Sequence, residues 1–171
     1  MKHQAILSYD YHLWANNKFF GHLKELPDEI YSQEIESVFP SIAETLSHIY
    51  VTDTIWLGVI LEDNFDQVRA SGVKAAEATK GKNLEDLEDM FKELSERYKA
   101  FFNSEDDFDR PMVLEHPHYG RLETQLSNLV QQVVNHGTYH RGNLTAMIRQ
   151  LGHPSVPTDY ILYLYDKNAK N

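Results

Sequence analysis

The chain of 171 residues contains no cysteine. This absence excludes disulfides, a cysteine nucleophile and any metal site built on thiolates. A bound metal would need histidine, aspartate or glutamate as ligands, and a thiol that takes part in a reaction would have to arrive with a substrate. The sequence also lacks a glycine-rich phosphate loop and a G-x-S-x-G motif, so no pattern in it places a nucleotide or a serine nucleophile.

Positive charge is scarce. Lysine and arginine total 16 against 26 aspartates and glutamates, which gives a formal net charge of −10. Such a balance opposes the counterion release that drives binding to nucleic acids, and it opposes attraction to anionic lipid surfaces. The basic residues are scattered and form no patch along the sequence. We therefore expect neither a nucleic-acid partner nor a membrane partner.

Long apolar runs are also missing. The longest strongly apolar stretch, Ile55–Leu61, is far too short to cross a bilayer. The first residues have a polar side chain or a tyrosine at nearly every second place and lack the continuous apolar stretch and small-residue cleavage site of a signal peptide. These features favour a cytoplasmic protein.

Apolar side chains recur at helical spacing in four long segments, at about residues 4–25, 41–62, 84–103 and 124–152. The third segment has the most regular pattern, with Leu84, Leu87, Phe91, Leu94, Tyr98 and Phe101 on one face. Asn83 can cap that helix, and Ser41 can cap the second, with Pro40 as an alternative start.

The connections between these segments differ in length. Residues 63–82 contain glycines and many small or charged residues, and their composition predicts a crossover connection. The segments around Pro117–Gly120 carry a weak signal for a short hairpin before the last long helix, and Tyr160–Tyr165 can add short turns that pack on the bundle. The sequence thus predicts one all-α domain, residues 1–171, folded as a four-helix bundle with long crossover connections.

Two histidines, His136 and His140, fall within the apolar stripe of the last long helix, between Val133 and Leu144. Residues four apart lie one above the other on a helix, so two imidazoles at this spacing can share one cation. The metalloprotease motif H-E-x-x-H has the same spacing, but Gly137 stands where its glutamate would be. The spacing alone leaves two interpretations open, a metal site and a pair of hydrogen-bonded core histidines.

Residues elsewhere offer partners for this pair. His48 lies near the middle of the second helix among apolar neighbours, either as a third ligand or as a core histidine. Asp53 falls on an apolar face, where it can pair structurally, with Arg141 for example, or orient a histidine ligand. The remaining histidines lie near the chain start, at helix ends or in loops: His3, His12, His22, His116, His118 and His153. We expect their side chains to be solvated. His116 and His118 are also candidates for a pocket rim.

Three stretches carry a resemblance to a known family: Tyr11–Phe20, Thr45–Leu57 and Asn135–Leu144. Through them, over about residues 5–165, the chain resembles the DinB family of four-helix metalloproteins. The most specific element is HxxxHRG, preceded some ninety residues earlier by the histidine of TLxHI. The resemblance implies a divalent metal bound by His48, His136 and His140. Asn143 departs from the family pattern, which commonly has glutamine there.

The resemblance also implies a function. Members of the wider superfamily include transferases and isomerases that use a metal to activate a low-molecular-weight thiol such as bacillithiol, mycothiol or glutathione. We therefore expect a metal-dependent thiol S-transferase that acts on a small thiol and an electrophile, with zinc as the first choice of metal and nickel as the alternative. A metal-dependent hydrolase and a stress-response scaffold that binds metal without catalysis remain open. The family habit implies a homodimer.

Overall fold

The structure is a computed structural model that describes residues 2–169, and most of this part of the chain is helical. Along the sequence the elements are α1 (Gln4–Leu23), α2 (Glu29–Ser32), α3 (Ile42–Ile60), α4 (Phe65–Thr79), α5 (Leu84–Ser104), β1 (Pro111–His116), β2 (Gly120–Gln125), α6 (Leu126–Gln150) and α7 (Tyr160–Asn168).

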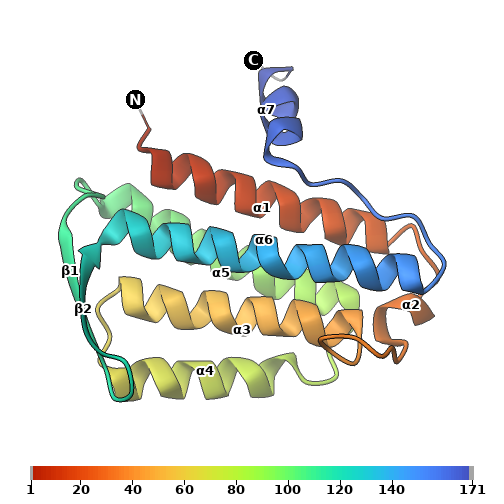
Figure 1. Ribbon diagram of the computed structural model, residues 1–171, viewed down its shortest axis with the longest axis horizontal. Coiled ribbons are helices and arrows are strands. Elements are labelled where there is room, and N and C mark those ends of the chain that lie inside the picture. Colours follow the sequence, from red (N-terminus) through yellow and green to blue (C-terminus); the bar gives the residue numbers. More distant parts are fainter. Residues whose placement is uncertain (1, 170–171) are drawn as a thin grey trace.

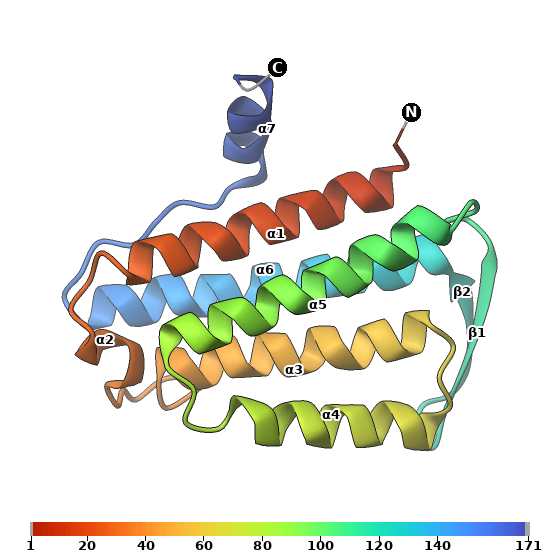
Figure 2. The same cartoon turned by 180° about the vertical axis from the view of Figure 1, so that it is seen from behind.

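The four long helices α1, α3, α5 and α6 form the bundle, which confirms the predicted fold (Figure 1). Helix α6 packs against both α1 and α3, and α5 contacts the same two helices from the opposite side (Figure 2). Helices α3 and α6 run in opposite directions, so that the hydroxyl of Thr45, early in α3, lies 3.3 Å from the sulfur of Met147, late in α6. Helix α5 runs parallel to α3, and this requires a crossover between them.

Two of the predicted caps are present. The Ser41 hydroxyl accepts a hydrogen bond from the backbone N–H of Glu44 at 3.1 Å, so Ser41 and not Pro40 marks the start of α3. The Asn83 side chain accepts from the N–H of Asp86 at 2.8 Å and begins α5. Each cap satisfies one of the backbone donors that the first turn of a helix leaves unpaired.

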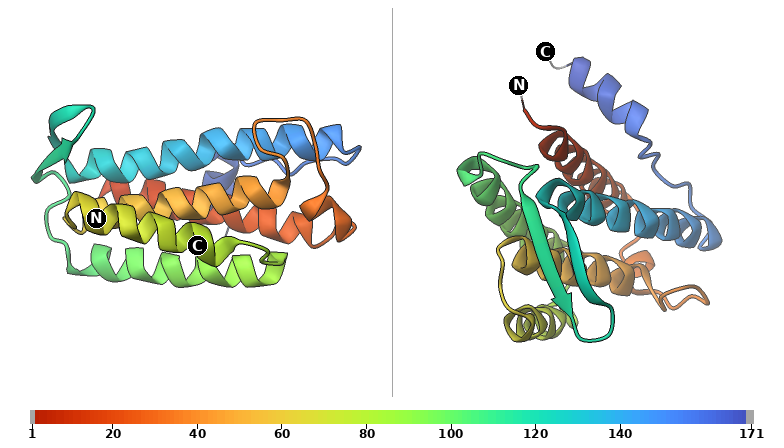
Figure 3. Two further views of the ribbon diagram at one scale, coloured as in Figure 1. Left: turned by 90° about the horizontal axis from the view of Figure 1, so that it is seen from below. Right: turned by 60° about the vertical axis from the view of Figure 1, so that its left-hand side comes forward.

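The crossover between α3 and α5 is itself helical, which the sequence interpretation missed. Helix α4 packs along α3 and runs beside the bundle (Figures 1 and 3). It begins with a full capping box, in which Asn64 and Gln67 exchange side chain–backbone hydrogen bonds at 2.9 and 3.0 Å. A Cβ atom added to Gly72 would lie 2.9 Å from the Ile55 side chain, so the small residues of α4 allow its close approach to α3.

The predicted hairpin forms between α5 and α6. Strands β1 and β2 are antiparallel, with Met112 opposite Thr124 and Leu114 opposite Leu122, and they lie across one end of the bundle (Figure 3). The last helix packs on the bundle as expected, but at nine residues it is longer than the short turns that the sequence predicted. Helix α7 contacts α1 and projects away from the other helices, and the indole N–H of Trp14 donates to Asp166 at 2.9 Å.

Two apolar clusters fill the bundle, one near each end. The first is built around residues such as Tyr9, Tyr98 and Val133, and the second around residues such as Phe20 and Leu144. Between them the interior is polar, because the middle turns of α1, α3 and α6 carry buried polar side chains: His12, Asn16, Asp53, His140 and Arg141. Among residues 2–169, no helix has both the length and the apolar character needed to cross a membrane.

Candidate metal centre

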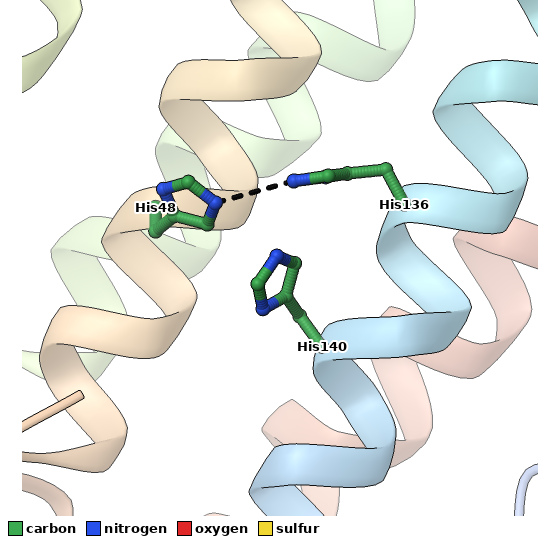
Figure 4. A group of neighbouring side chains, drawn as sticks. All are labelled: His48, His136 and His140. Carbon is green, nitrogen blue, oxygen red and sulfur yellow. Dashed lines mark hydrogen bonds between the residues drawn. The ribbon is translucent and has the colours of Figure 1, made fainter. Parts of the chain in front are cut away.

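Three histidines meet in this polar middle layer. His48 comes from α3, and His136 and His140 come from consecutive turns of α6 (Figure 4). Each offers one ring nitrogen, and these three nitrogens lie within 4.8 Å of one another. The ring centroids are 4.4 Å apart for His136 and His140 and 4.5 Å apart for His48 and His140. The antiparallel packing of α3 on α6 thus places a third imidazole against the pair that the sequence spacing had placed on one face.

The nitrogen separation suits a small cation. The Nε2 atoms of His48 and His136 are 3.2 Å apart. Two nitrogens bound tetrahedrally to zinc at about 2.0–2.1 Å would be separated by about 3.3 Å. The described residues at this position therefore fit a divalent transition metal, and three imidazoles leave at least one coordination position for another ligand.

The site is partly shielded from water. His140 is 6% exposed, and His48 and His136 are half-buried. The ring of Phe39, in the segment before α3, lies 4.8 Å from the His48 ring and 5.5 Å from the His140 ring. Phe39 therefore covers one side of the cluster, while the half-buried rings keep an opening toward solvent.

This environment keeps the imidazoles neutral. Burial first, and then the neighbouring imidazoles with His140 foremost, lower the pKa of His136 to about 4. Burial and the proximity of His48 lower the pKa of His140 to about 4, and burial also lowers the pKa of His48. At neutral pH each ring therefore has a lone pair free for a metal.

Hydrogen bonds already select one nitrogen on His140. Its Nδ1 lies 3.3 Å from the side-chain amide of Asn143, one turn further along α6. Nε2 is the nitrogen left for a metal, and binding through it puts the proton on Nδ1, where the amide oxygen of Asn143 is the matching acceptor. Asn143, the residue that departs from the family pattern, is therefore in a position to orient the ring.

A buried polar network lies beside the cluster, and sequence reasoning missed its central residue. His12 was expected to be solvated, but it is 1% exposed in the bundle interior, and its Nε2 lies 2.9 Å from Oδ2 of Asp53 and 3.0 Å from the amide of Asn16. Tyr9, His12, Asn16 and Phe19 share the inward face of α1. That 3-4-3 spacing was the sequence signal that could have identified His12 as an interior residue.

Asp53 and Arg141 do not form a direct ion pair, because His12 lies between them. Arg141 is 1% exposed and donates to Nδ1 of His12 at 3.2 Å, to Asn16 at 2.9 Å and to Thr138 at 2.9 Å. The structural pairing expected for Asp53 therefore exists, with His12 as its partner.

The other histidines lie away from the cluster. His3 caps α1, and His22 lies 2.7 Å from the carbonyl oxygen of Pro154. His116 and His118 lie at the turn of the hairpin, where the His116 ring contacts Phe65 at the start of α4. They do not line the groove beside α6, and their role at a pocket rim stays a prediction.

That groove, of about 800 Å³, lies beside α6 away from the three histidines. Its walls come from α1, α6 and the segment that leads into α7, and they include Tyr11, Thr138, Arg141 and Ser155. The three histidines do not contribute to it. The cluster is thus a separate feature within the bundle.

Comparison with known proteins agrees with this arrangement. The sequence profile of the DinB family matches residues 1–170. The chain belongs to the DinB family. It is also 47% identical over 161 residues to Protein DinB of Bacillus subtilis (strain 168), and the match covers 94% of each chain. Among residues 2–169, the three clustered histidines are the group of side chains that could hold a metal ion.

Proposed function

We propose that His48, His136 and His140 bind one divalent transition metal and that the protein uses it to transfer a low-molecular-weight thiol to an electrophile. The observation that carries the metal site is the convergence of three neutral imidazoles from two helices within 4.8 Å. Membership in the DinB family supports the same site.

Zinc is the metal we propose, with nickel as the alternative. Imidazole ligands suit both ions, and the ligand type does not distinguish them. The near-tetrahedral separation of the His48 and His136 nitrogens, 3.2 Å, favours zinc. Because the chain has no cysteine, no thiolate of its own competes for the metal or for the electrophile.

The chemistry follows from the ligand set. A bound divalent ion supplies Lewis acidity, which lowers the pKa of a thiol or water that it binds. Neutral histidines leave the positive charge of the site uncompensated, so they favour binding of an anionic sulfur. Phe39 limits access of bulk water on one side, and the half-buried rings leave an opening for substrates. In the transfer, sulfur forms a bond to the electrophilic carbon, the leaving group departs with its bonding pair, and the thiol proton passes to solvent.

The test is a thiol-transfer assay on zinc-loaded protein with bacillithiol and chlorodinitrobenzene, in which chloride is the leaving group. We expect conversion above the uncatalysed rate, and loss of that excess in His48→Ala. Glutathione and mycothiol replace bacillithiol in parallel reactions. If none of the three thiols raises the rate, or if His48→Ala retains the full rate, the transferase proposal is wrong.

One structural feature favours a second candidate, a scaffold whose metal is structural. The cluster lies between the two apolar clusters and joins α3 to α6, so a bound ion would cross-link two bundle helices. Such a protein would bind metal and gain stability from it without catalysis. A hydrolase that uses metal-bound water is the third alternative. An assay of hydrolysis by the same zinc-loaded protein, without added thiol, distinguishes a hydrolase from a thiol transferase.

We further propose a homodimer. Four large side chains of α7 are exposed, between 40% and 69% of their surface: Tyr160, Ile161, Leu164 and Tyr165. A contiguous apolar surface of this kind is typical of an interaction face. Sedimentation equilibrium of the full chain, with Leu164→Glu as the variant, tests whether α7 forms the contact.

A further inference from the structure

Among residues 2–169, three side-chain polar atoms are fully buried and have no hydrogen-bond partner: Oδ1 of Asp53, Nδ1 of His136 and Nε of Arg141. Buried polar atoms without partners are rare in folded proteins, because each loses its hydration without compensation. The first two atoms are complementary in kind. A carboxylate oxygen accepts hydrogen bonds, and an imidazole nitrogen that carries a proton donates one.

The proposed metal site decides which nitrogen of His136 carries the proton. Its Nε2 faces the other two histidines, 3.2 Å from Nε2 of His48. If Nε2 binds the metal as a neutral ligand, the proton must be on Nδ1. Histidines that bind metals almost always donate this second N–H to a carboxylate, a carbonyl or water. A buried Nδ1–H of His136 therefore needs an acceptor.

Asp53 is the one acidic residue in the described chain that is fully buried, and half of its carboxylate is free. Oδ2 is held by His12 at 2.9 Å, and Tyr98 donates to the backbone carbonyl of Asp53 at 2.7 Å. These two contacts fix the residue from the sides of α1 and α5. Oδ1 is left without a partner.

Asp53 also lies on the side of the cluster where His136 is found. Because α3 and α6 are antiparallel, moving from His48 toward Asp53 leads toward the start of α6, where His136 precedes His140. The His12 ring that holds Asp53 also contacts the residue after His136, since a Cβ on Gly137 would overlap its Cε1. One imidazole thus separates the Asp53 carboxylate from the backbone next to His136.

We infer that Asp53 is a positioning residue for the metal centre, whose Oδ1 accepts the Nδ1–H of His136 when Nε2 of that histidine binds the metal. The inference rests on the proposed metal site. The contact forms directly between these two atoms or through one bridging water. The carboxylate then fixes the tautomer and orientation of the ring and increases its strength as a ligand.

Zinc affinity of the Asp53→Asn variant tests this role, measured by competition with a chromophoric chelator. The substitution keeps the shape of the side chain and removes its charge. We expect affinity to fall by about ten- to a hundredfold. The matched control is Tyr98→Phe, which removes the bond to the Asp53 carbonyl but keeps the carboxylate, and it should bind zinc like the wild type. Equal affinity in Asp53→Asn and wild type, or an equal loss in both variants, would overturn the inference.

A second measurement uses the wild-type protein and does not depend on how a variant folds. In ¹⁵N-detected NMR of the zinc-loaded protein, His136 should show a protonated Nδ1 whose hydrogen is shifted downfield and protected from exchange with water. A metal-bound Nδ1, or an Nδ1–H that exchanges freely, would show that Asp53 does not hold it. A wild-type protein that binds no zinc removes the metal site itself, and this result is distinct from failure of the Asp53 contact alone.

Discussion

Gly137 lies directly against the imidazole of His12. A Cβ atom at residue 137 would overlap Cε1 of that ring and would lie 2.5 Å from its Nδ1 and 2.8 Å from the guanidinium of Arg141. His12 cannot move aside freely, because it is buried and bonded to Asp53 at 2.9 Å. The absence of a side chain at residue 137 therefore allows α1 and α6 to pack around the polar layer.

We expect Gly137→Ala to destabilise the protein by about 1–3 kcal/mol, the usual effect of overpacking a rigid interior. Urea unfolding measures the change. The matched control is Gly142→Ala on the same helix, where a Cβ meets no atom within 4 Å. That variant should gain up to about 1 kcal/mol, because alanine is the better helix former. A Gly137→Ala protein as stable as the Gly142→Ala protein would contradict the packing described.

Stability of the metal-free protein should fall as the pH drops from about 6.5 toward 4. The pKa values of His136 and His140 are lowered to about 4 in the folded chain, whereas an unfolded histidine titrates near 6.5. Within this window the unfolded state binds more protons, so acidification favours unfolding, and the contribution is fully present above pH 6.5. Thermal midpoints at pH 7 and pH 5, measured with a chelator present, show the effect.

Other groups titrate in the same range, so a control is needed. The double variant His136→Ala, His140→Ala lacks both rings and should lose less stability between pH 7 and pH 5 than the wild type. If the two proteins respond equally to pH, the histidines are not held neutral by the fold.

The amide of Asn143 should contribute to metal affinity through His140. Its side chain lies 3.3 Å from Nδ1 of that ring. Asn143→Ala should weaken zinc binding by about tenfold, because the ring loses the contact that orients it. Asn143→Gln keeps an amide and should bind more tightly than the alanine variant. Calorimetric titration with zinc gives both values, and identical affinities in all three proteins would exclude the role.

A metal that binds only the folded chain stabilises it against unfolding, whether its role is structural or catalytic. Zinc at a hundred times its dissociation constant should stabilise the folded chain by about 2.7 kcal/mol through mass action. The wild type should therefore melt at a higher temperature with zinc than with a chelator, and His48→Ala should show no difference. A large stabilisation without any thiol transfer would favour the scaffold, and transfer activity would favour the enzyme.

The long helices could be predicted because their apolar residues repeat with helical spacing and their ends carry caps such as Ser41 and Asn83. Helix α4 was missed for a physical reason. Its face toward α3 consists of small side chains such as Gly72 and Ala75, which bury little apolar surface and give a weak pattern. The capping box of Asn64 and Gln67 was the signal that marked its start.

The candidate site could be predicted only in part from the sequence. His136 and His140 share a face through their spacing alone, but the approach of His48 depends on how α3 packs against α6, which no local pattern specifies. His12 was assigned to solvent because of its place near the chain start, although its spacing from Tyr9 and Phe19 placed it inside. Its contact with Asp53 joins residues 41 apart in sequence and required the folded bundle.

The most direct test of the proposed metal centre is the metal content of protein purified without an affinity tag, measured by plasma mass spectrometry beside the double variant His136→Ala, His140→Ala. We expect about one transition metal ion per chain in the wild type and none in the variant. A wild-type protein that is empty and cannot be loaded with zinc or nickel would contradict the metal centre and leave the three residues as core histidines.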